Sequence, residues 1–125
     1  MPRRRATAKK SPSLRADLRY QIEILLPVFY NDGREIEIAE SAATVNELCD
    51  KFGGLRWSSA SAPAPLEGLW RDAEQIYSDR LRTVIIETTH DNRLFRWLHT
   101  FKRKLETRFD QIEIYITVTE ILRVL

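Results

Sequence analysis

Residues 94–119, LFRWLHTFKRKLETRFDQIEIYITVT, join a helical pattern directly to a strand pattern. In the first part, apolar residues recur at i, i+4, i+7, i+11 and i+15, which is the spacing of one helix face. This stripe consists of Leu94, Leu98, Phe101, Leu105 and Phe109. From Gln111 to Thr119 every second residue is isoleucine or valine, the period of a strand with one buried face. We therefore predict a helix from a cap near Asp91 to about Phe109, followed by a strand.

The start of the domain reads as a hairpin. Residues 20–30, YQIEILLPVFY, alternate in the manner of a strand, although Pro27 cannot donate a hydrogen bond to a neighbouring strand. Asn31-Asp32-Gly33 is a tight-turn sequence, and residues 34–38, REIEI, alternate again. These features predict a hairpin, or a strand with a hairpin-like extension.

A second helix and two more strands fill the middle of the chain. The capping box Thr44-x-x-Glu47 predicts a helix that begins there and ends at Gly53. Residues 55–58 can begin a strand, and the loop 58–68 interrupts it before the chain returns to the sheet or its rim. Residues 76–89 predict a central strand, because their middle is apolar on both parities.

The order strand with hairpin, helix, strand, strand, helix, strand predicts an α+β fold of the ferredoxin-like kind. Four antiparallel strands would form one layer, two helices would cover one face, and the hairpin would extend the N-terminal strand. One domain over residues 17–125 accounts for this pattern, which is appropriate for a chain of 125 residues.

The charge of the chain is divided unevenly. Residues 1–19 hold seven basic and one acidic side chain, a net charge of +6, whereas the other 13 basic and 17 acidic groups give −4. A segment rich in Arg, Lys, Ser and Pro buries too little apolar surface to offset its ordering entropy. We predict that residues 1–16 form a disordered basic tail. Its candidate contacts for phosphates or an acidic partner are Arg3, Arg4, Arg5, Lys9 and Lys10.

The second face of the predicted sheet also carries large apolar side chains. They are Leu25, Phe29, Ile85 and Tyr115. A sheet face left to water is normally polar, so we expect a cover over this one. A second copy of the chain is the first hypothesis, because exposed apolar patches mark interfaces and two-fold homodimers are common. The alternatives are another protein, the chain's own 55–70 segment with its C-terminal end, or a flat ligand such as single-stranded nucleic acid.

Groups suited to catalysis are sparse. The sequence holds no G-x-S-x-G, H-E-x-x-H or P-loop motif, and its two histidines, His90 and His99, do not share a helix face. The lone Cys49 falls within a helical apolar stripe, which indicates a buried structural thiol. We predict no metal site and no cofactor. The enzyme hypothesis that remains is a small dimeric α+β barrel, with its pocket near Trp57, Trp70, Tyr77 and His90.

Four short motifs resemble a group of small bacterial proteins of uncharacterised activity. The motifs are FGGLRW at 52–57, GLW at 68–70, Asp79 before an apolar strand, and LETRFDQIEIYI at 105–116. Arg56 stands where that group usually has threonine. The resemblance covers residues 20–120 and implies a ferredoxin-like domain, but it implies no activity.

These observations favour a non-enzymatic interaction or regulatory module that dimerises or binds a partner protein through its second sheet face. No run of about 18 apolar residues exists, so no membrane span is expected. The segment at the start lacks the apolar stretch of a secretory signal, and a cytoplasmic location is the default expectation.

Any affinity for nucleic acid should come from the basic tail, be weak and depend on salt. If about five phosphates are neutralised, the logarithm of the binding constant should fall with the logarithm of the salt concentration at a slope of about −4, with negligible sequence preference. Titration of labelled DNA and RNA with the full chain, and with a version lacking residues 1–16, measures this contribution. Equal binding by the two proteins, or binding indifferent to salt, would show that the tail is not the contact.

Overall fold

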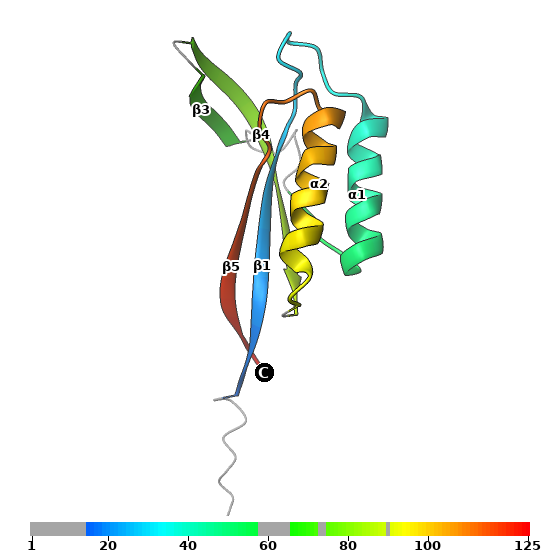
Figure 1. Cartoon of the computed structure of the whole chain (residues 1–125), viewed down its shortest axis with the longest axis vertical. Coiled ribbons are helices and arrows are strands. Elements are labelled where there is room, and N and C mark those ends of the chain that lie inside the picture. Colours follow the sequence, from blue (N-terminus) through cyan, green and yellow to red (C-terminus); the bar gives the residue numbers. More distant parts are fainter. Residues whose placement is uncertain (1–14, 58–65, 73–74, 90) are drawn as a thin grey trace, which may run out of the picture.

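A computed structural model describes residues 15–57, 66–72, 75–89 and 91–125, the segments 66–72 and 75–80 by their backbone alone (Figure 1). The strands and helices follow one another in the order that the sequence predicts. The described elements are β1 (Ala16–Pro27), α1 (Ile38–Phe52), β2 (Arg56–Trp57), β3 (Leu66–Asp72), β4 (Gln75–Thr88), α2 (Leu94–Arg108) and β5 (Tyr115–Val124). The basic tail predicted at residues 1–16 lies almost wholly outside the described residues.

The sheet is antiparallel, with β1 and β4 at its centre. Its strand order is β2-β4-β1-β5, and β3 pairs with β4 as well. β2 pairs with Val84 and Ile85, whereas β3 pairs with the first half of β4, from Gln75 to Leu81. β2 and β3 thus occupy one edge position in two pieces, and the sheet has the four-position layout of a ferredoxin-like fold. The predicted fold class is confirmed.

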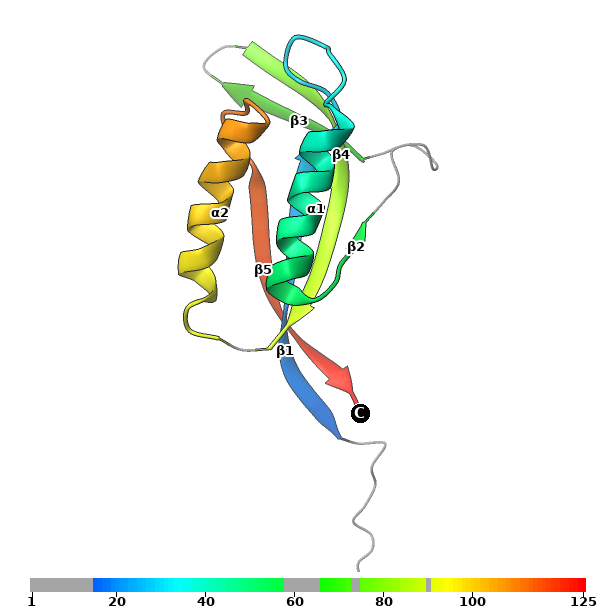
Figure 2. The same cartoon turned by 90° about the vertical axis from the view of Figure 1, so that its right-hand side faces the viewer.

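Both helices lie on the same face of the sheet (Figures 1 and 2). The apolar stripe of α2 is buried there as predicted, with Leu105 and Phe109 no more than 1% exposed. From the sheet, alternate residues of the two central strands meet this stripe. These are Ile22, Ile24 and Leu26 of β1 with Val84 and Ile86 of β4. The core is therefore a layer between α2, α1 and the two central strands.

The hairpin-like extension predicted after β1 is present but short. β1 ends at Pro27, which has no N–H for a ladder, and beyond it Phe29 and Glu35 form an isolated antiparallel bridge. On either side of this bridge the Tyr30 N–H donates to the Arg34 carbonyl at 2.8 Å and the Ile36 N–H donates to the Val28 carbonyl at 3.1 Å. The tight turn at Gly33 is present, with a φ of 91° that favours glycine. Residues 34–38 form no regular strand and Ile38 already belongs to α1, so of the two possibilities the strand with a hairpin-like extension is confirmed.

The predicted capping box is also wrong, because α1 begins at Ile38 and Thr44 lies within the helix. Residues 38–43, IAESAA, contain three alanines and a glutamate, which favour a helix over the strand suggested by alternation. The predicted end is confirmed, since the Gly53 N–H donates to the Cys49 carbonyl with a φ of 89° at Gly53.

Thr44 instead takes part in a polar network between the two helices. Its hydroxyl donates to the Glu40 carbonyl at 3.0 Å and accepts a hydrogen bond from Arg108 Nη1 at 2.9 Å. Arg108 Nη1 also lies 2.8 Å from Glu47 Oε1, and Lys104 Nζ lies 2.9 Å from the other Glu47 oxygen. The hydrogen bond from Arg108 is the main reason that the pKa of Glu47 is lowered. The Thr44–Glu47 pair therefore joins two helices rather than starting one.

The last strand begins four residues later than predicted and continues further. β5 starts at Tyr115, opposite Leu25, and runs to Val124, opposite Ala16. Its pairing cannot begin much earlier, because the residues before Tyr115 would lie opposite the end of β1 at Pro27. Ile112, which the alternation placed inward, lies outside the strand and is 58% exposed. The apolar residues after Glu120 continue the strand as far as Val124.

Replacement of Thr44 by valine should destabilise the protein by about 1–2 kcal/mol, because it leaves Arg108 without one buried acceptor. Thr100→Val is the matched control, since the Thr100 hydroxyl makes the same bond to the carbonyl four residues earlier but is exposed. That control should change the free energy of unfolding by less than about 0.5 kcal/mol. Urea denaturation of both variants measures the difference, and equal losses would show that the interhelical bond contributes nothing.

Candidate functional site

Three of the four apolar residues predicted for the second sheet face do lie together. Leu25 and Tyr115 are directly opposite each other in the β1–β5 ladder, and Ile85 has the same parity on β4. Tyr115 is 59% exposed, whereas Leu25 and Ile85 are partly buried. Phe29 follows the end of β1 and is held by its bridge to Glu35, so it is not part of the sheet ladder.

Polar side chains surround this apolar group on the same face. Glu23 pairs with Ile85 and Thr117, and Glu87 lies 3.4 Å from Arg56 across the β2–β4 pair. The apolar area on the outer face is therefore an island around Leu25 and Tyr115 rather than a continuous surface.

A larger set of exposed apolar side chains lies where β1 and β5 extend past the helices. Figure 1 shows these two strands continuing beyond the ends of α1 and α2. Four side chains there form what we call the ribbon patch: Leu18, Leu122, Val124 and Leu125, exposed by 48%, 70%, 76% and 49%. Alternation alone does not identify this patch, because it does not reveal where the covering helices stop.

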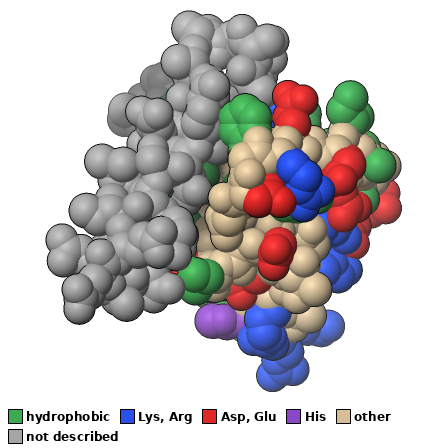
Figure 3. All heavy atoms as spheres, turned by 90° about the horizontal axis from the view of Figure 1, so that it is seen from above, with side chains coloured by type: hydrophobic (Ala, Val, Ile, Leu, Met, Phe, Trp, Pro, Cys, Tyr) green, Lys and Arg blue, Asp and Glu red, His purple; other side chains and the backbone are tan. Residues whose placement is uncertain are grey.

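The opposite end of the molecule is different. Figure 3 shows the described part of that end with acidic and basic side chains interspersed and hydrophobic side chains isolated from one another. Mixed charge of this kind keeps a surface solvated. The exposed apolar side chains thus lie together in the ribbon patch, whereas those on the described part of the opposite end are separated by charged residues.

The pocket predicted near Trp57, Trp70, Tyr77 and His90 falls mostly on residues whose side chains are not described. Trp70 and Tyr77 are opposite each other in the β3–β4 ladder, and His90 lies outside the described residues. Trp57 lines a cavity of about 500 Å³ formed with the end of β1 and the first half of α1. Trp57 pairs with Val84 on the helical side of the sheet, so it lies on the opposite side from Tyr115.

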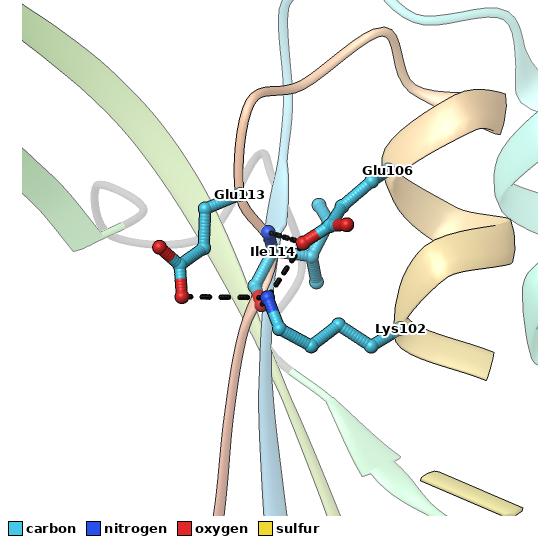
Figure 4. A network of polar contacts seen from close by, with 4 residues as sticks. All are labelled: Lys102, Glu106, Glu113 and Ile114. Atoms are coloured by element: carbon cyan, nitrogen blue, oxygen red, sulfur yellow. Dashed lines mark hydrogen bonds and ion pairs between the residues drawn. The ribbon is translucent and has the colours of Figure 1, made fainter. Parts of the chain in front are cut away.

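A polar network fixes the start of β5 against α2 (Figure 4). Lys102 Nζ forms an ion pair with Glu106 Oε2 and donates to the Ile114 carbonyl at 2.9 Å, and Glu113 lies 3.3 Å away. Glu106 Oε2 also accepts the Ile114 N–H at 3.1 Å. Burial would raise the pKa of Glu106, but these hydrogen bonds outweigh it and lower the pKa.

Metal-ligating side chains do not gather anywhere in the described ranges: no three His, Cys, Asp or Glu residues lie close enough to hold one ion. No helix among the described elements has the length and apolar composition needed to cross a membrane. The basic residues Arg3, Arg4, Arg5, Lys9 and Lys10 lie outside the description, so their contacts stay a prediction.

Comparison with known proteins supports the fold. The sequence matches no protein family and has no significant match among curated proteins. Among solved structures it is similar to the divalent cation tolerance protein CutA1 of Thermus thermophilus, with a TM-score of 0.54, 12% identity, and 82% and 84% of the two chains covered.

Two further solved structures show the same likeness. CutA1 from Oryza sativa has a TM-score of 0.54 at 9% identity, with 85% of this chain and 82% of that chain covered. A phage SAM lyase, solved in complex with S-methyl-5'-thioadenosine, has a TM-score of 0.56 at 10% identity, with 86% and 90% covered. At such identities the likeness establishes a shared fold for proteins of different described activities.

The Lys102 network yields a test based on pH. Glu106→Gln should lower the free energy of unfolding at pH 7 by about 1–3 kcal/mol, because an ionised acceptor is lost from two hydrogen bonds. The folded-state pKa of Glu106 lies below its ordinary value of 4.5, so its contribution is present above that pH and disappears as pH falls through the folded value. The two proteins should therefore converge in stability as the pH falls below 4.5 and Glu106 becomes protonated in the folded protein.

Glu113→Gln is the control for this measurement. Its carboxylate contacts the same lysine, but its side chain is 66% exposed. Exposed ion pairs contribute about 0–1 kcal/mol, so this variant should differ little from the wild type. A loss as large as that of Glu106→Gln, or one independent of pH, would contradict the role assigned to Glu106.

Proposed function

We propose that this protein is a non-enzymatic interaction module that pairs with a second copy of itself along β5 and its ribbon patch. The observation that carries the proposal is the concentration of exposed apolar side chains on the projecting part of β1 and β5. Contiguous exposed apolar surface marks an interface more often than it marks a free surface. A second copy is the simplest occupant, because two-fold homodimers are the commonest assemblies.

Strand and helix lengths explain why the patch is uncovered. β1 has 12 residues and spans about 40 Å at roughly 3.4 Å per residue, whereas α2 has 15 residues and spans about 22 Å. The part of β1 that outruns the helices pairs only with β5, from Ala16↔Val124 to Arg19↔Ile121, as far as the described residues show. A two-stranded ribbon is marginally stable in water by itself, so a further contact is needed to bury its apolar side.

The free edge of β5 supplies the second argument. β5 is the terminal strand of the sheet in the part of the chain that the structure describes, and its ten residues contain no proline or glycine. Edge strands are normally protected by charges, proline or bulges. The charged residues of β5 are Glu120 and Arg123, and Arg123 Nη2 already lies 3.3 Å from Asp17 on β1. The edge is therefore long, apolar and weakly protected.

Antiparallel pairing of β5 with its copy satisfies both requirements. Such a contact is self-complementary, and it would join two four-position sheets into one continuous sheet. Leu122 and Val124 share a parity, so both would face the same side as their counterparts on the partner strand. The outer-face island of Leu25, Ile85 and Tyr115 is the other candidate contact, and it lies toward the opposite end of β5.

A divalent-cation role is not part of this proposal, although the name of the CutA1 proteins refers to cation tolerance. The described residues offer no three potential ligands in one place. A binding role based on protein contacts requires only the surfaces described above.

In sedimentation equilibrium from about 1 to 100 µM, the mass of the wild type should approach that of two 14.7 kDa chains as the concentration rises. Leu122→Glu should shift the equilibrium to the monomer, with the dissociation constant raised at least about tenfold, because a charge would be buried at the contact. Ile112→Glu is the matched control, since Ile112 is a similarly exposed apolar residue outside β5. That variant should associate like the wild type.

Tyr115→Glu separates the two candidate surfaces. If the outer face is the contact, this variant will dissociate and Leu122→Glu will not, which would overturn the ribbon patch as the interface. If the wild-type chain remains a monomer at every concentration, the proposal of self-association is wrong.

A further inference from the structure

The cavity beside Trp57 has the composition of a small-molecule site. Its volume is about 500 Å³, within the range of ligand pockets in proteins. Most of its lining is apolar, from Pro27, Val28, Ile36, Ile38, Val45 and Trp57. Ser41, Asn46 and two charged residues, Glu35 and Arg82, supply the polar groups. Apolar walls with a few polar groups are typical of sites that orient a small ligand.

Arg82 is the unusual member of this lining. It pairs with Leu26 in the β1–β4 ladder, on the face where Val84 and Ile86 are buried in the core. Among the described residues no carboxylate forms an ion pair with it, and its buried Nε atom has no hydrogen-bond partner. Burial is the cause of the lowered pKa of Arg82, but an arginine stays protonated near neutral pH. A charge that is partly removed from water without a partner is costly.

Trp57 holds the guanidinium in a position where it can still bind an anion. The Cζ atom of Arg82 lies 4.4 Å from the centre of the Trp57 ring, which is a cation–π contact. A cation–π contact offers the guanidinium a ring face but no hydrogen-bond acceptor, so it does not satisfy the N–H donors. The contact therefore orients the cation without satisfying its donors.

We propose that this cavity binds a small organic monocarboxylate, with the carboxylate on Arg82 and an apolar body against Trp57, Ile36 and Val45. A planar guanidinium matches a carboxylate with two parallel hydrogen bonds, and the apolar walls match a hydrocarbon or aromatic group. Among the described lining residues Arg82 is the one cation, and Glu35 is the acidic residue. This balance disfavours phosphates with two or more charges.

The cavity is independent of the proposed interface. It lies beside β2 and β4, at the other edge of the sheet from β5 in the strand order β2-β4-β1-β5. Failure of one proposal therefore leaves the other standing, and a monomer can be tested for ligand binding as readily as an oligomer.

Titration of the full chain with 4-phenylbutyrate tests the site, with the indole N–H of Trp57 and the Nε–H of Arg82 followed by NMR. Saturable binding below about 10 mM is expected. The neutral analogue 4-phenylbutanol should bind at least about tenfold more weakly, because it lacks the charge that pairs with Arg82. Phenyl phosphate should also bind more weakly. Equal affinity for the alcohol, tighter binding of the phosphate, or no saturation would each overturn the proposal.

Variants of Arg82 give the second measurement. Arg82→Gln should weaken 4-phenylbutyrate binding at least about tenfold and abolish the rise in melting temperature that the ligand causes in the wild type. Arg82→Lys keeps the charge but loses the planar fork, so it should bind with intermediate affinity. Arg96→Gln, at an exposed arginine of α2, is the control and should bind like the wild type.

A merely structural Arg82 would give a different pattern. Its replacement would lower the melting temperature without ligand and leave ligand affinity unchanged in the folded fraction, and that result would contradict the proposal. If Arg82→Gln does not fold, the Arg82→Lys variant and the comparison of acid with alcohol on the wild type still decide the matter.

Discussion

The mismatch in length between β1 and the helices that cover it determines most of what this molecule presents to its surroundings. From Tyr20 to Pro27, β1 pairs with β4 and over most of that length with β5 as well, and Ile22, Ile24 and Leu26 are buried in the core. From Ala16 to Arg19 the same strand pairs with β5 alone among the described elements, and the residues of the buried parity lie beyond the helices. The alternation that builds a core in the longer part therefore builds an exposed apolar surface in the shorter part.

Sequence patterns predicted those elements whose periodicity is not disturbed by a partner elsewhere in the chain. The stripe of α2 and the glycine that ends α1 are of this kind, because a helix face and a left-handed φ are local properties. The start of α1 was predicted wrongly because Thr44 and Glu47 match a capping box but are held by Arg108, 61 to 64 residues later. No local rule contains that information. The start of β5 was likewise set by the end of β1 at Pro27.

The candidate sites divide in the same way. Leu25, Ile85 and Tyr115 could be assigned to one face from parity alone, and the ladders place them there. To predict the ribbon patch, one would have to know how far the strands extend past the helices, and alternation does not encode these relative lengths. The cavity needed the diagonal approach of Arg82 and Trp57 across β4 and β2, and a two-residue strand such as β2 leaves almost no periodic signal.

The two halves of the sheet are suited to different roles for a physical reason. At the β5 edge, no described strand pairs with the outer backbone donors and acceptors over ten residues, so the partner that satisfies them best is another strand. Along most of the β4 edge, from Gln75 to Leu81 and at Val84 and Ile85, the backbone pairs with β3 and β2. There the group without a hydrogen-bond partner is the side-chain cation of Arg82, inside an apolar hollow. An edge with unpaired backbone groups is suited to bind another strand, whereas an apolar hollow that holds one cation is suited to bind a small anion. One fold can therefore hold a protein contact and a ligand site without either competing for the other's groups.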